Sequence, residues 1–157
     1  MILTALKLNK HNGRCKFNID RFSIVVMNLD KEKQLFEKYP KIFSNLKYTE
    51  CGDGWYDIID ALCAVLQNEA DNAAYRLPED EKESVQPLAA QVKEKFGGLR
   101  FYIYGGNEEM WGAIRMAEAM SHRICEDCGV PGHKQPGGWI RTLCDPCQEA
   151  RATRKFP

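Results

Sequence analysis

Two pairs of cysteines have the spacing of a metal site. Cys125 and Cys128 form one C-x2-C pair, Cys144 and Cys147 form a second, and fifteen residues separate the pairs. This spacing is typical of four-thiolate zinc sites. Four thiolates close a tetrahedral shell, so we predict one structural Zn²⁺ rather than a catalytic one. The alternatives are a chance spacing of four free cysteines, or a shell in which His133 replaces one thiolate.

The residues around these pairs predict a small module over residues 121–157. Turn-forming residues follow the first pair at Gly129, 131–132 and 136–138. Residues 139–143 have the pattern of a strand that runs into Cys144. The residues after Cys147 are good helix formers, so the second pair is expected at a helix N-terminus, where the helix dipole stabilises thiolates. Together these features predict a treble-clef or ribbon-like zinc module.

Composition places the chain among ordinary globular proteins. It has 157 residues, of which 44% are hydrophobic and 28% charged, enough for one compact body and a small module. No stretch approaches the roughly 18 apolar residues of a membrane span, and the N-terminus lacks the layout of a signal peptide. We therefore expect a cytoplasmic protein with no membrane contact. We also expect that its seven cysteines form no disulfides. The sequence does not predict an oligomeric state.

Apolar residues at helical spacing predict the helices of an α+β body over residues 27–120. The clearest helix is expected from Trp55 to about Asn68, and residues 31–39 predict another. Residues 69–84 are acidic and contain Pro78, which predicts a surface loop. A further helix is expected from Glu108 to Ile124. Its predicted buried stripe comprises Met110, Trp111, Ile114, Ala117, Met120 and Ile124.

Residues 91–104 alternate in a way that predicts an antiparallel hairpin. With Gly97–Gly98 as a two-residue turn, Phe96 would face Leu99 and Val92 would face Ile103. The opposite face would carry Lys93, Lys95, Arg100, Tyr102 and Tyr104. The alternative is a helix over residues 87–96 that ends at Gly97. The predicted fold class is therefore α+β, with helices packed on a small antiparallel hairpin, followed by the C-terminal four-cysteine zinc module.

Charge is unevenly distributed along a chain whose formal net charge is zero. Residues 1–26 hold five Lys or Arg against one Asp, and we interpret them as a basic N-terminal arm, with Met27 as an alternative start. Residues 50–83 hold ten Asp or Glu against two Lys or Arg. The chain as a whole therefore lacks the strongly basic stripe that is typical of nucleic-acid-binding proteins.

Several motifs together resemble a family of small proteins from tailed phages and prophages. They are Gly52-Asp-Gly-Trp55, the segment Val-Lys-Glu-Lys-Phe-Gly-Gly-Leu-Arg-Phe-Tyr at 92–102, and Gly-Trp-Ile-Arg-Thr-Leu-Cys at 138–144 with its second cysteine pair. The resemblance covers residues 35–148 and brings no known activity. It implies a phage origin and an intracellular setting in an infected bacterium. Phage proteins of this size often bind and redirect a host protein, which is an argument by association.

Three classes of function follow from these residues. We favour a non-enzymatic protein that binds a host protein, in which residues 50–83 complement a basic surface of a DNA-handling or defence complex. The candidate contacts are Asp53, Trp55, Arg100 and Trp139. The first alternative is a nucleic-acid-binding module that uses the face of Lys93, Lys95, Arg100 and Tyr102.

A nuclease-like enzyme is the second alternative. The chain has three histidines, His11, His122 and His133. None of them stands in a His-Asn-His or Asp-His arrangement of the kind that a treble-clef nuclease needs. Cys51 in its glycine-rich loop is the other candidate nucleophile, but no histidine lies near it in sequence.

Overall fold

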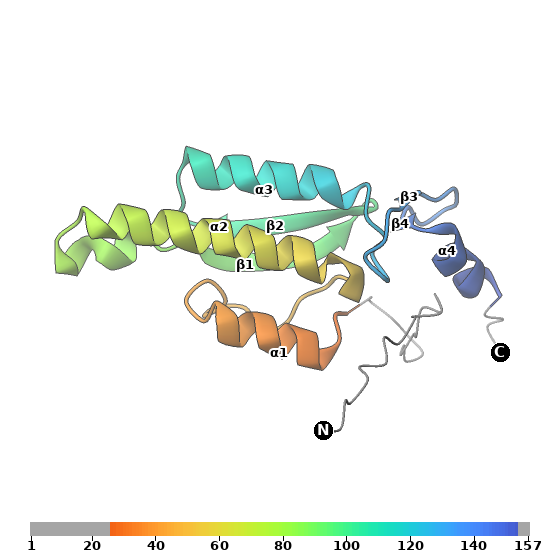
Figure 1. The fold of residues 1–157 in the computed structure, drawn as a ribbon, viewed down its shortest axis with the longest axis horizontal. Coiled ribbons are helices and arrows are strands. Elements are labelled where there is room, and N and C mark those ends of the chain that lie inside the picture. Colours follow the sequence, from red (N-terminus) through yellow and green to blue (C-terminus); the bar gives the residue numbers. More distant parts are fainter. Residues whose placement is uncertain (1–25, 154–157) are drawn as a thin grey trace, which may run out of the picture.

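The computed structural model describes residues 26–153 and has the predicted α+β class. Three helices and a two-stranded antiparallel hairpin form the body, and a small C-terminal module follows (Figure 1). The predicted arm at residues 1–26 lies outside the described residues, except for Val26. The body comprises α1 (Leu29–Lys38), the 3₁₀ helix η1 (Asp53–Trp55), α2 (Tyr56–Tyr75), the 3₁₀ helix η2 (Glu79–Val85), β1 (Leu88–Lys95), β2 (Gly98–Tyr104) and α3 (Glu108–Ser121). The C-terminal module comprises β3 (His133–Lys134), β4 (Thr142–Leu143) and α4 (Asp145–Ala152).

One hydrophobic core joins the helices to the inner face of the hairpin. Leu35 of α1, Ile59 of α2 and Phe101 of β2 are almost completely buried in this core. Helix α3 packs on both α2 and β2. The remaining core residues from the strands and α3 are Ala89, Val92, Leu99, Ile103, Met110, Ile114 and Ala117. The alternation and the helical spacing in the sequence therefore identify most of the buried positions, because each reports one-sided burial.

The hairpin is confirmed, but the predicted turn is wrong by one residue. Lys95 pairs with Gly98, so the turn is Phe96–Gly97. Both turn residues have positive φ, 55° and 76°, as a type I′ turn requires. Val92 consequently pairs with Phe101 instead of facing Ile103, and Phe96 is 65% exposed instead of facing Leu99.

Both edges of the hairpin are covered. Along β1, the Glu50 N–H donates to Val92 O, and the Glu94 N–H donates to Glu50 O, both at 2.8 Å. Along β2, the Leu99 N–H donates to Ser121 Oγ at 2.8 Å, and the Phe101 N–H donates to a Glu118 carboxylate oxygen at 3.1 Å. Neighbouring segments thus satisfy edge groups that would otherwise be open to strand pairing.

Two helix predictions need correction. Helix α2 continues to Tyr75, so the predicted loop at 69–84 begins later and contains η2. Side-chain hydrogen bonds from Gln67 to Asp71 and from Asn72 to Asn68, four residues apart, support the extra turns. Helix α3 ends at Ser121 rather than Ile124. Within its predicted stripe, Met120 is 48% exposed.

The C-terminal module has less strand than the sequence predicts. Of the predicted strand at residues 139–143, Thr142 and Leu143 form β4, which pairs with β3 in antiparallel fashion. Trp139 lies outside the strand and is 70% exposed. Among residues 26–153, no helix combines the length and the apolar character that crossing a membrane requires.

Candidate metal centre

The four cysteine sulfurs meet at one point in the C-terminal module. The Sγ atoms of Cys125, Cys128, Cys144 and Cys147 all lie within 4.8 Å of one another. Cys128 Sγ lies 3.6 Å from Cys144 Sγ and 3.5 Å from Cys147 Sγ. A tetrahedron with Zn–S distances of about 2.3 Å has sulfur–sulfur edges of about 3.8 Å. The predicted four cysteines therefore cluster with a geometry that fits one metal ion such as zinc.

The cluster is largely closed to solvent. Cys125, Cys144 and Cys147 are buried and Cys128 is half-buried. Burial raises the pKa of the Cys128 thiol, because a thiolate in an apolar environment lacks hydration. A divalent cation would supply the positive charge that four neighbouring thiolates need. The arrangement has the character of a structural metal site.

Local backbone structure sets the position of each cysteine pair. In the first pair, the Gly129 N–H donates to Cys125 O at 2.9 Å, and Gly129 has a φ of 80°, a conformation that glycine adopts at low cost. In the second pair, Cys144 is the N-cap of α4 and Cys147 lies in its first turn. The prediction that the second pair lies at a helix N-terminus is confirmed.

A bidentate ion pair joins the two halves of the module. Arg151 of α4 donates from Nε to Asp127 Oδ2 at 2.7 Å and from Nη2 to Asp127 Oδ1 at 2.5 Å. The Asp127 side chain is 2% exposed. This pair fixes the helix that bears Cys147 against the turn that bears Cys128, in the geometry that suits a planar guanidinium.

The Gly52–Trp55 loop supports the first cysteine pair from the body. The Gly54 N–H donates to Glu126 O at 2.8 Å, and Trp55 Nε1 donates to Ile124 O at 3.0 Å. A β-carbon on Gly54 would lie 2.1 Å from Cys125 O, so only glycine fits at this contact. The motif that the sequence presented as a glycine-rich loop is therefore a structural support for the metal site.

The hairpin turn makes a second contact with the module. Thr142 Oγ1 donates to Gly97 O at 2.5 Å. A β-carbon on Gly98 would lie 2.3 Å from Cε1 of His122. The two adjacent glycines therefore have different roles: the Gly97 carbonyl accepts a hydrogen bond from β4, and Gly98 leaves room for the His122 ring.

Glu126 is a buried carboxylate between the module and the body. Its side chain is 0% exposed, and Arg141 Nη1 lies 3.4 Å from its Oε2. The Gly52 N–H donates to Oε1 at 3.3 Å. Burial raises the pKa of Glu126 to about 7, and the Arg141 charge opposes this rise. No sequence signal identifies this residue, because a glutamate between two cysteines is ordinarily a solvated charge.

Two of the predicted partner contacts, Trp55 and Asp53, make contacts within the molecule. Trp55 is 0% exposed, so it contributes to the core and to the support of the module. Asp53 accepts a hydrogen bond from the Asn28 N–H at 2.6 Å and lies 3.8 Å from Lys31 Nζ. Trp55 is therefore closed to a partner, whereas the Asp53 side chain is 38% exposed and also links η1 to the start of α1.

The other predicted contacts lie on two surfaces. Lys93, Lys95, Arg100 and Tyr102 share the outer face of the hairpin. Arg100 is half-buried, and its Nη1 donates to Leu99 O at 2.7 Å. Trp139 is exposed beside the metal module, and its ring centroid lies 5.9 Å from the Arg141 guanidinium carbon.

Neither described histidine joins the cysteine cluster. His133 Nε2 lies 3.4 Å from Asp145 Oδ1 at the surface, and the cluster comprises the four cysteines alone. Burial lowers the pKa of His122, and the cations Lys134 and Arg100 lower it further. Burial also raises the pKa of the Cys51 thiol far above its usual range, and a buried, protonated thiol is a poor nucleophile.

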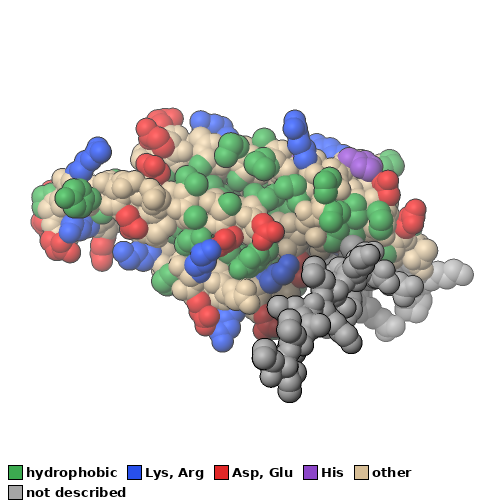
Figure 2. Space-filling model, viewed as in Figure 1, with side chains coloured by type: hydrophobic (Ala, Val, Ile, Leu, Met, Phe, Trp, Pro, Cys, Tyr) green, Lys and Arg blue, Asp and Glu red, His purple; other side chains and the backbone are tan. Residues whose placement is uncertain are grey.

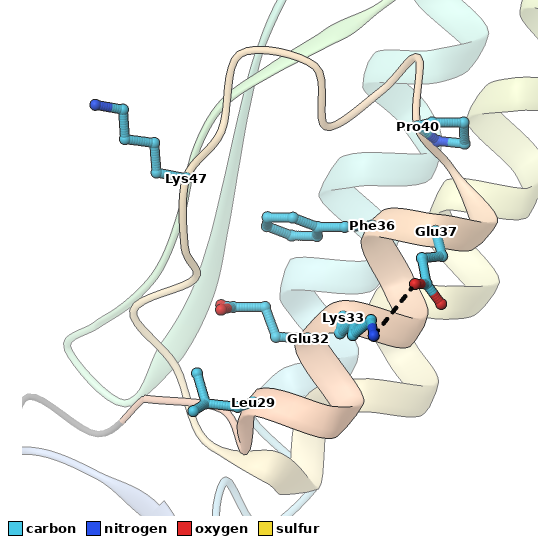
Figure 3. A pocket seen from close by; sticks show the side chains of 7 residues that line it. All are labelled: Leu29, Glu32, Lys33, Phe36, Glu37, Pro40 and Lys47. Atoms are coloured by element: carbon cyan, nitrogen blue, oxygen red, sulfur yellow. Dashed lines mark ion pairs between the residues drawn. The ribbon is translucent and has the colours of Figure 1, made fainter.

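A hollow on α1 lies away from the metal centre. It has a volume of about 600 Å³ and is lined by Leu29, Glu32, Lys33, Phe36, Glu37, Pro40 and Lys47 (Figure 3). Glu32 already accepts hydrogen bonds from the backbone N–H and the hydroxyl of Thr49. Lys33 lies 3.7 Å from Glu37. These charges are engaged within the chain, and nothing in the hollow indicates a ligand.

Comparisons with models of protein families, with curated proteins and with solved structures found no match to this chain. The resemblance to small phage proteins therefore remains an expectation from the sequence motifs.

Proposed function

We propose that this chain is a non-enzymatic, phage- or prophage-type zinc protein that binds and modulates a host protein inside the bacterium. The phage setting rests on the resemblance of its motifs. The binding role rests on one observation, an exposed apolar cluster beside the metal module. We name this the junction cluster and define it as Phe96, Trp139 and Ile140.

The junction cluster brings together two segments that are distant in sequence. Phe96, Trp139 and Ile140 are 65%, 70% and 41% exposed. A β-carbon on Gly97 would lie 3.1 Å from Ile140 Cγ2, so the hairpin turn and the loop before β4 are neighbours. More broadly, hydrophobic side chains gather over the half of the molecule nearer the module on the face drawn in Figure 2.

Exposed aromatic residues of this kind are typical of protein interfaces. Tryptophan is enriched among the residues that contribute most to binding energy. Phe96 also keeps a positive φ of 55°, which is unfavourable for a residue with a β-carbon. A strained and exposed aromatic side chain contributes little to folding, so its role is better explained by contact with a partner.

Cations flank the junction cluster and define the partner chemistry. Lys95 Nζ lies 5.5 Å from the centroid of the Phe96 ring, and Arg141 lies over the ring of Trp139. A partner surface that complements this cluster is therefore apolar at its centre and acidic at its rim, in place of the basic surface expected from the charge of residues 50–83. The bound metal would hold the loop that carries Trp139, so partner binding would depend on zinc.

The test is affinity capture from host lysate with three baits: the wild type, Trp139→Ala and Tyr75→Ala. Tyr75 is 89% exposed at the end of α2, so its variant controls for loss of any exposed aromatic side chain. We expect a partner that survives nuclease treatment, is retained by Tyr75→Ala and is lost with Trp139→Ala, and that binds again as a purified protein. Capture that vanishes with nuclease, or that does not depend on Trp139, would contradict the proposal.

A further inference from the structure

The outer face of the hairpin carries tyrosines and cations at neighbouring positions. The register pairs Lys93 with Arg100 and Gln91 with Tyr102. Strand alternation places Lys95 and Tyr104 on the same face. Tyr102 is 41% exposed and Tyr104 is 65% exposed. Lys93 Nζ lies 5.9 Å from the centroid of the Tyr102 ring, so cation and aromatic ring form one continuous surface.

The segment before η1 widens this face beyond β1. Glu50 forms a parallel bridge with Lys93. Thr49 is 0% exposed, whereas its neighbour Tyr48 is 56% exposed. Alternation therefore adds Tyr48 to the outer face together with Glu50. We name Tyr48, Lys93, Lys95, Tyr102 and Tyr104 the tyrosine face.

The covered edges of the hairpin restrict how a ligand can bind here. Glu50 occupies the backbone groups of β1, and Ser121 and Glu118 occupy those of β2. A peptide strand therefore finds no free edge along these stretches to extend the sheet. A ligand on this face must instead stack on the tyrosine rings and interact electrostatically with the lysines.

We propose that the tyrosine face binds single-stranded nucleic acid. Aromatic rings stack on bases of any sequence, and neighbouring cations bind the phosphates. Tyr102 and Tyr104 are two residues apart on one strand, about 7 Å, so each ring can serve a separate base. The tyrosine face shares no residue with the junction cluster, although Lys95 lies beside Phe96; the inference stands whether or not a host protein binds the junction cluster.

The charged residues on and around the tyrosine face determine where the phosphates of a bound nucleic-acid strand lie. The acidic residues of η2 precede β1 in the chain, so they lie toward the open end of the hairpin, near Tyr104. Lys93 and Lys95 lie toward the turn. Glu50 also lies on this face, beside Lys93, and its carboxylate repels phosphate there. Phosphates are therefore bound closest to the turn, near Lys95, and the bases extend toward Tyr104. The small number of cations predicts weak binding that is sensitive to salt.

The test is fluorescence anisotropy with a labelled 20-nucleotide oligothymidylate at low salt, using the full chain loaded with zinc. We expect binding that weakens about tenfold in Tyr102→Ala, the loss of one stacked base. Tyr102→Phe keeps the ring and is expected to bind as the wild type does. The double variant Lys93→Gln with Lys95→Gln is expected to flatten the salt dependence, which for two phosphates has a log–log slope of about −1.4.

Matched control variants test whether a loss of oligonucleotide binding is specific to the tyrosine face. Tyr75→Ala changes an exposed residue at the end of α2, and Lys33→Gln changes an exposed residue of α1. Neither residue belongs to the hairpin, and we expect both variants to bind as the wild type does. Circular dichroism and thermal unfolding verify that each variant is folded. The inference is overturned by a wild type that does not bind the oligonucleotide, by equal loss in the control variants, or by binding that Tyr102→Ala leaves unchanged. Equal affinity for a duplex of the same length would also overturn it, since stacking requires unpaired bases.

Discussion

Gly54 lies in contact with the backbone of Cys125, so that a β-carbon on residue 54 would stand 2.1 Å from the Cys125 carbonyl oxygen. The same β-carbon would lie 2.4 Å from the amide nitrogen of Gly129 and 2.8 Å from that of Cys128. The body and the turn of the metal site therefore meet backbone to backbone, and neither can move without displacing the other.

Gly54→Ala tests this contact. We expect a loss of about 2–3 kcal/mol in the free energy of unfolding, because rigid backbone must shift to admit the methyl group. Weaker metal retention is expected with it. Urea unfolding and competition with a chromophoric chelator measure the two effects. Gly112→Ala is the matched control, since a β-carbon there meets only a side-chain atom at 3.9 Å. In the interior of α3 it is expected to be neutral or slightly stabilising; equal losses in both variants would contradict the argument.

Metal removal is expected to unfold the module before the body. Outside its cysteines, the buried apolar cluster of the module consists of Leu143, which cannot offset the conformational entropy of ordering the segment. We predict one zinc per chain by elemental analysis. Chelation or Cys144→Ser is expected to abolish protease resistance in the C-terminal quarter, while the helices of the body persist at least in part. Protein purified without chelator that contains no metal, or a disulfide between any two of the four cysteines, would contradict this prediction.

The Asp127–Arg151 pair is expected to stabilise the module. Arg151→Ala would leave a buried carboxylate without its partner, at a cost of about 3 kcal/mol. Arg151→Lys keeps the charge but loses the bidentate geometry, so we expect a smaller loss of about 1–2 kcal/mol. Denaturant unfolding of the zinc-loaded protein measures both. Lys33→Ala removes an exposed pair on α1 and is expected to have no measurable effect.

Phe96→Asn separates stability from binding. Asparagine tolerates the positive φ that Phe96 holds and is the preferred residue before glycine in a type I′ turn. We expect the free energy of unfolding to rise by about 1 kcal/mol, while partner capture through the junction cluster weakens. A variant that loses both stability and binding would show that Phe96 acts in folding instead.

Protonation of His122 is expected to reduce stability as the pH falls. Burial lowers the pKa of His122 in the folded state, whereas the unfolded chain titrates near the usual value of about 6.5. Between the unfolded and the folded pKa, the unfolded state binds a proton that the folded state does not, so stability falls through this window and levels off below it. The variant His122→Gln lacks the titratable imidazole and therefore lacks this contribution to the pH dependence. The unfolding midpoint of the wild type should therefore fall relative to that of His122→Gln as the pH drops from 7.5 to 5.5; parallel curves would contradict the assignment.

The four-cysteine cluster and the main elements of the body follow from the sequence alone. Two C-x2-C pairs identify the cluster because the geometry of each pair is local and the spacing allows one ion to bind all four thiolates. Alternation and helical spacing predict the hairpin and the helices because each pattern reports which side of an element is buried. These patterns involve residues that are close together in the sequence, so they can be recognised without the tertiary structure.

The roles of the glycines and tryptophans depended on the tertiary structure. Nothing local distinguishes Gly97–Gly98 from Phe96–Gly97 as a turn. In the tertiary structure Gly98 is a strand residue, and the ring of His122 leaves no room for a side chain there. Trp55 and Trp139 are both preceded by glycine in the sequence, yet one is buried and the other is 70% exposed. Contacts between segments more than 40 residues apart, such as Gly97 with Thr142, settle these positions, and no periodicity in the sequence records them.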